Sequence, residues 1–186
     1  MIDVPTGWLW IGFVIALALT GLIGLGFCRY GLSTAATPGG ILDFELAGDA
    51  EQACRIANAW RAAGLLDNAR PNLRLDMVWI PCYAAALALG CLIAARLNAG
   101  WWASTGMAIA AGQLIAGLLD YGENIALLRT LSELDRLKED RATHECAAQL
   151  SAAPPKIAAW CARMKLRLIT VGLVYILMAL LFWLLT

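Results

Sequence analysis

The sequence has few of the residues on which enzymes rely for chemistry. Its 186 residues include one histidine, His144, which lies in a charged stretch, and its six cysteines form no C-x-x-C pair. No glycine-rich phosphate loop or nucleophile elbow occurs, so the common phosphate-binding and acyl-transfer motifs are absent. We therefore expect no metal, no cofactor and no nucleic-acid partner, and we favour a protein that is not an enzyme.

Charged residues are also scarce, and long apolar runs take their place. Charged residues make up 15% of the chain and hydrophobic residues 61%, against roughly 45–50% apolar residues in soluble domains. Four runs approach or exceed the ~20 residues that span ~30 Å of hydrocarbon. They lie at about 7–28, 77–97, 101–121 and 167–185. The sequence predicts an all-α polytopic protein, a four-transmembrane-helix bundle that forms one membrane domain over 1–186.

No lysine or arginine precedes the first run or follows the fourth. Thirteen of the fourteen basic residues lie in, or at the edge of, segments 29–76 and 122–166, and Arg96 is the exception. The positive-inside rule therefore places both long segments in the cytoplasm and both termini outside. We expect an integral protein of the bacterial inner (plasma) membrane. The first run lacks the basic region of a signal peptide, so we expect a retained span.

The cysteines are not expected to form a disulfide framework. Four of them, Cys28, Cys54, Cys146 and Cys161, fall in or beside the segments assigned to the cytoplasm, where thiols stay reduced. We expect all six to behave as small buried hydrophobic residues.

An amphipathic helix is predicted within segment 29–76. Asp49 suits an N-cap, apolar residues such as Ile56 and Trp60 follow at helical spacing, and Gly64 suits the C-terminal end. We expect this helix at the membrane interface, where it packs on the bundle or on lipid headgroups; a surface for a protein partner is the less favoured alternative. Pro71 is then expected to end the loop before the second span, which starts at Asp76.

Two spans are predicted to continue as cytoplasmic helices. Beyond residue 122, Leu127, Leu131 and Leu134 keep a helical stripe among charged residues. Pro155 is well placed to start another helix, and nothing from Lys156 to about residue 185 interrupts it.

Small and polar residues share one face of the third span. Their spacing alternates between three and four residues, so we expect this face inside the bundle. They are Gly106, Ala110, Gln113, Gly117, Asp120 and Asn124.

Polar and acidic side chains at the end of the third span form the candidate site. Asp120, Glu123 and Asn124 lie within reach of one another on a helix, and ionisable residues in a span mark functional or pairing sites. Asp76 is expected at similar depth, with Tyr83 and Gln113 lining the same interior. Such a cluster could bind a cation or hold a proton. A dinuclear metal site is not expected, because Glu-x-x-His pairs are absent.

We favour a structural role for this cluster over a ligand-binding role. In the structural role, the acids pair with basic residues at the helix ends and hold the bundle together. The candidate bases are Arg29, Arg163, Lys165 and Arg167.

These observations favour a non-catalytic accessory, assembly or scaffold subunit. Its partners would be membrane lipids and another membrane protein or a second copy of the chain. The alternative function is an enzyme or transporter that binds a small lipid-like or cationic ligand at the acidic cluster.

Overall fold

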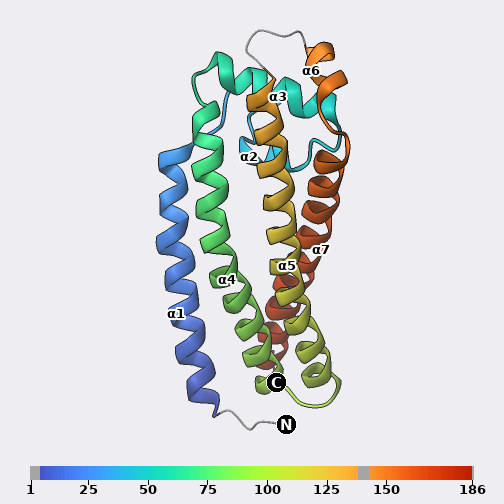
Figure 1. Cartoon of the computed structure of the whole chain (residues 1–186). Helices are drawn as coiled ribbons and strands as arrows, with labels where there is room; N and C mark the ends of the chain where they lie inside the picture. Colours follow the sequence, from blue (N-terminus) through green and yellow to red (C-terminus); the bar gives the residue numbers. More distant parts are fainter. Residues whose placement is uncertain (1–4, 138–142, 186) are drawn as a thin grey trace. The chain divides into compact units, whose positions relative to one another are not determined.

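The computed structural model describes residues 5–137 and 143–185 (Figure 1). These residues form helices and connections without a strand, which confirms the predicted all-α class. The elements are α1 (Thr6–Gly24), a 3-10 helix η1 (Leu25–Tyr30), α2 (Ile41–Glu45), α3 (Ala50–Ala62), α4 (Leu66–Leu97), α5 (Trp101–Arg136), α6 (Thr143–Gln149) and α7 (Ala153–Leu185).

Among the residues that the structure describes, four helices are long and apolar enough to cross a membrane, as predicted. They are α1 continued by η1, α4, α5 and α7. The 36 residues of α5 and the 33 of α7 rise about 54 Å and about 50 Å at ~1.5 Å per residue, well beyond ~30 Å of hydrocarbon. Both helices therefore continue past the predicted spans, which confirms the predicted helical extensions.

The start of α4 differs from the prediction. We expected a loop to end at Pro71, yet α4 begins at Leu66 and passes through Pro71. A proline within a helix removes one backbone hydrogen bond and crowds the carbonyl four residues earlier. Pro71 is the sixth residue of α4, so the missing hydrogen bond is one of the first in the helix. The helix forms without it.

Contacts divide the chain into two units. The membrane unit comprises Met1–Gly24, Val78–Leu118 and Met164–Thr186, and the second unit comprises Leu25–Met77 and Leu119–Arg163. Helices α4, α5 and α7 contribute residues to both units, which are described separately below.

Small residues hold the helices of the membrane unit together. Each member of the predicted inward face of α5 in this unit is buried: Gly106, Ala110, Gln113 and Gly117. At Gly106, a Cβ atom would overlap the Tyr175 hydroxyl and would lie 2.6 Å from the Ala95 Cβ. Close approach of backbones through small residues is typical of helix packing in membranes.

Helix α3 confirms the predicted amphipathic helix in the second unit. The Asp49 side chain accepts a hydrogen bond from the Gln52 amide, so Asp49 is the N-cap. At the other end Gly64 has a φ of 69°, which favours glycine, and the Leu65 amide donates to the Trp60 carbonyl. This pair of features is a Schellman end.

The apolar face of α3 lies in the core of the second unit. Trp60 is fully buried, packs against Phe44 with ring centroids 5.2 Å apart, and donates its indole N–H to the Thr37 hydroxyl at 3.2 Å. Leu127 and Leu131 of the extended α5 belong to the same core. The leucine stripe predicted beyond residue 122 therefore packs within the protein.

Two cysteine predictions are wrong. Cys54 of α3 and Cys146 of α6 form a disulfide across 92 residues of sequence, and Cys28 is exposed. The disulfide was missed because neither spacing nor composition reveals that α6 packs on α3. Cys91 and Cys161 are buried free thiols, as expected.

Candidate functional site

Two members of the candidate site meet directly in the second unit. The Asn124 side-chain amide of α5 donates a hydrogen bond to the Asp76 carboxylate of α4 at 2.6 Å. Three residues earlier along α5, the Tyr121 hydroxyl donates a hydrogen bond to the carbonyl of Met77, the residue after Asp76, at 2.9 Å. These two bonds join α4 to α5 at neighbouring positions.

The other acids of the site lie on the same helix and are buried. Asp120 is 2% exposed and Glu123 is fully buried. Since they lie four and one residues before Asn124, helical geometry places them on the side of α5 that faces the interior. The predicted inward direction of the polar face is therefore confirmed for Asp120 and Asn124, and Glu123 beside them is buried as well.

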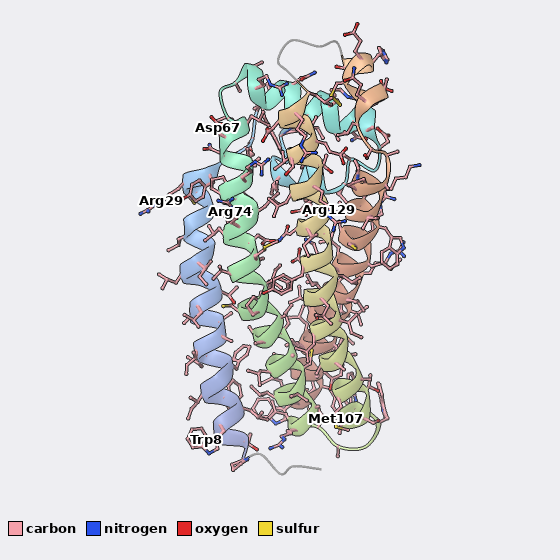
Figure 2. All side chains as sticks on the ribbon, viewed as in Figure 1. Trp8, Arg29, Asp67, Arg74, Met107 and Arg129 are labelled. Carbon is pink, nitrogen blue, oxygen red and sulfur yellow. A yellow bond between two sulfur atoms is a disulfide. The ribbon has the colours of Figure 1, made fainter. Side chains whose placement is uncertain are left out.

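The four candidate bases differ in exposure. Lys165, in the membrane unit, is buried, whereas Arg29, Arg163 and Arg167 are exposed. Figure 2 shows the side chain of Arg29 extending away from α4. Ion pairing between these bases and the acids stays a prediction.

In the membrane unit, Gln113 joins α5 to α7. Its amide donates to the Leu168 carbonyl at 2.9 Å and to the Ile109 carbonyl of its own helix at 3.3 Å. A Cβ at Gly172 would lie 2.7 Å from the Gln113 Cδ, so glycine at this position makes room for the amide. Tyr83 is buried and packs against Trp79 with ring centroids 4.8 Å apart. Both residues are interior, and their bonds and contacts are those of helix packing.

The side-chain amides of Asn124 and Gln113 each have an oxygen atom that is buried without a hydrogen-bond partner in the described structure. These atoms are Asn124 Oδ1 and Gln113 Oε1. An unsatisfied buried carbonyl oxygen costs about 1–3 kcal/mol. Each could accept a hydrogen bond from a small donor such as water or an ammonium group.

The candidate residues supply carboxylates, amides and a phenol. Within residues 5–137 and 143–185, no group of three or more His, Cys, Asp or Glu side chains has an arrangement that could hold a metal ion. His144 lies on α6, exposed, with Nδ1 4.0 Å from a Glu51 carboxylate oxygen. The arrangement can hold helices together and can bind a small hydrogen-bond donor.

Sequence reasoning missed a depression in the second unit. It has a volume of about 270 Å³ and is bordered by the 36–38 loop, α2 and α3. Its polar lining residues are Thr37, Asp43, Gln52 and Arg55. The Asp43 carboxylate already accepts a hydrogen bond from the Gly39 amide at 2.9 Å. The volume is slightly below the ~300–1,000 Å³ typical of small-molecule sites.

No family model, curated protein or solved structure matches this chain.

Proposed function

We propose that this chain is a non-catalytic accessory or assembly subunit of the membrane, which binds another membrane protein through the outer face of α1. The observation that carries the proposal is the small share of α1 that its own chain covers. Of its 19 residues, Leu9 and Ala16 alone are buried in the described structure. The exposed residues of the helix are available to lipid or to a partner.

The contacts of α1 within the membrane unit lie along one side of the helix, beside α4 (Figure 1). The Trp79 indole of α4 donates to the Thr20 carbonyl at 2.8 Å, and Phe13 approaches Gly90 of α4. The opposite side carries Val14, Ala18 and Leu22, all exposed. These three residues, four apart, form one stripe, which we call the outer stripe of α1.

Membrane physics favours a partner for such a helix. Lipid tails are as apolar as leucine, so helices associate in a bilayer through close packing and hydrogen bonds. A helix with few contacts in its own chain gains such packing from a second protein. Ala18, in the middle of the outer stripe, is small enough to let another backbone approach.

The polar residues of the candidate site support the non-catalytic part of the proposal. Asn124 binds Asp76 and Gln113 binds the backbone of α7. These bonds join helix pairs, and a structural role of this kind requires no substrate.

Co-purification tests the proposal. The chain is extracted with its surrounding lipid, and bound proteins are quantified for the natural sequence, for Ala18→Phe and for Leu177→Phe, an exposed position of α7. We expect one stoichiometric membrane protein with the natural chain, at least about tenfold less with Ala18→Phe, and no change with Leu177→Phe, since ~1.4 kcal/mol of lost packing is a factor of ten. A natural chain that runs as a monomer without a bound protein contradicts the proposal.

A second candidate function is favoured by the buried Asn124 Oδ1, which has no partner in the described structure. A ligand with an ammonium or hydroxyl group would supply the missing donor beside the Asp76 carboxylate. This site would belong to an enzyme or transporter for a lipid-like or cationic molecule. The double variant Asp120→Asn with Glu123→Gln separates the two functions. If the variant keeps its cellular activity while its thermal stability falls, the acids have a structural role and the ligand-binding function fails.

A further inference from the structure

We propose that Cys54 and Cys146 form a reversible thiol–disulfide site, whose co-reactant is a small-molecule disulfide of the glutathione class. The proposal goes beyond the accessory function. It rests on the cytoplasmic placement predicted for segments 29–76 and 122–166.

The fold brings the two sulfur atoms together without a long-range rearrangement. Cys54 lies on α3 and Cys146 on α6, their Cα atoms are 6.1 Å apart, and the bond is formed. Disulfides usually join Cα atoms 4.4–6.8 Å apart. The same backbone therefore accommodates the pair when it is bonded, and its two helices pack on each other in the second unit.

The charge distribution places this pair in a reducing compartment. Thirteen of fourteen basic residues belong to the two segments that carry the cysteines or to their edges, and such a bias marks the cytoplasmic side. Cytoplasmic thiols are kept reduced, and disulfides that form there are usually transient and sense redox conditions. A pair already positioned for bonding would respond to the ratio of thiols to disulfides around it.

Local opening of α6 is the step that gives access to the sulfur atoms. Cys54 is fully buried and Cys146 is 6% exposed, and buried sulfur reacts slowly. Helix α6 has seven residues. Its other contacts in the described structure include the packing of Ala147 and Leu150 on the core and an exposed contact between His144 and Glu51. A helix of about two turns, with exposed residues such as His144 and Gln149, opens at a lower free-energy cost than a long core helix.

The proposed oxidation proceeds by two successive thiol–disulfide exchange reactions. The thiolate of Cys146, the more accessible residue, attacks oxidised glutathione, forms a mixed disulfide and releases one glutathione thiolate. The Cys54 thiolate then attacks the Cys146 sulfur of that mixed disulfide and releases the second glutathione. The two protein thiols lose two electrons and two protons, and the glutathione disulfide gains them as two thiols. Excess glutathione reverses both steps.

The consequence of oxidation is a change in the attachment of α6. The bond ties α6 to α3 covalently, whereas the reduced form keeps noncovalent contacts such as those of Ala147, Leu150 and His144. Amide hydrogens of residues 143–150 should exchange at least about tenfold faster in the reduced protein, because the bond removes open states of this segment. This surface of the second unit is therefore the part of the chain that redox conditions alter.

The experiment traps thiols in intact cells that express the full chain. Cys28, Cys82, Cys91 and Cys161 are replaced by serine, so that the pair alone remains. Cells are quenched with acid before and after diamide treatment, denatured, and alkylated with a maleimide polymer that shifts the protein on a gel. Cys54→Ser and Cys146→Ser in the same background mark the single shift. We expect a double shift in resting cells, no shift after diamide, and a double shift again after recovery.

Two outcomes overturn the proposal. A pair that resists alkylation in resting cells is a permanent structural disulfide, and a pair that stays fully alkylated after diamide is not a redox site. Orientation is measured separately with Ala152→Cys, an exposed position of the second unit, and a maleimide that cannot cross membranes. Labelling from outside intact cells would place the unit in the oxidising compartment and would also overturn the proposal. The accessory function would stand in each of these cases, because it depends on α1.

Discussion

Asn124 and Asp76 show how one polar pair can fix two helices. The amide donates to a carboxylate at 2.6 Å from a fully buried position. Hydrogen bonds to charged groups contribute about 1.5–3 kcal/mol, and an acceptor left unsatisfied in the interior costs a similar amount. At the residue scale, Asn124 is therefore expected to stabilise the junction between α4 and α5.

The Asn124→Ala variant tests this role. We expect the free energy of unfolding to fall by about 1–3 kcal/mol, because the substitution removes a hydrogen bond from a buried amide to a carboxylate. Thermal unfolding in detergent measures the change. Gln149→Ala removes an amide from an exposed position and should alter stability by less than about 0.5 kcal/mol. Equal stability of Asn124→Ala and the natural chain would refute a structural role for this amide.

At the scale of elements, the inward face of α5 was predictable and the start of α4 was not. Gly106, Gln113 and Asp120 recur at helical spacing among apolar residues, and this periodicity alone identifies a buried face. Near α4, Pro71 and mixed charges looked like a loop. Their helical conformation depends on tertiary contacts such as the bond from the Asn72 amide to the Tyr30 carbonyl, which no local pattern reveals.

The candidate site was predictable to a similar degree. The spacing of Asp120, Glu123 and Asn124 indicated one buried side of α5, and Asp76 was expected near it. The direct bond from Asn124 to Asp76 depends on how α4 and α5 are aligned along their axes. Sequence periodicity does not contain that alignment, and the Cys54–Cys146 bond was missed for the same reason.

Helix packing through Gly106 gives a second prediction. Gly106→Ala would place a methyl group against the Tyr175 hydroxyl and the Ala95 methyl group. We expect a loss of about 1–3 kcal/mol of stability through overpacking. Gly112→Ala on the same helix meets Leu168 at an ordinary 3.7 Å and should be neutral or up to about 1 kcal/mol more stable, because alanine favours helix. The two melting temperatures decide the matter, and a Gly106→Ala protein as stable as Gly112→Ala would show that α5 is not closely packed there.

Helix α3 gives a third prediction, since Trp60 anchors it in the core of the second unit. Trp60→Ala should cost about 3–5 kcal/mol, the usual range for a buried aromatic residue in a core. Limited proteolysis of the second unit, together with thermal unfolding, would detect the loss. Trp160→Ala is the matched control, because this tryptophan is 56% exposed in the same unit. Comparable effects of the two substitutions would contradict the anchoring role of Trp60.

At the scale of the whole molecule, the two units differ in how much apolar surface the chain itself buries. The second unit has a core that includes Trp60, Phe44 and Leu131, with its own caps and a disulfide. The membrane unit contains α1, which its own chain leaves largely uncovered.

The most direct test of the accessory function is a photo-crosslinking scan of α1 in living cells. A photoreactive amino acid is placed in turn at Val14, Ala18 and Leu22 of the outer stripe and at the buried Ala16. The account predicts adducts with one membrane protein from the three outer positions and none from Ala16, because a docked helix contacts its partner along one face. Outer positions that form no protein adduct, or adducts of equal yield from all four positions, would contradict it.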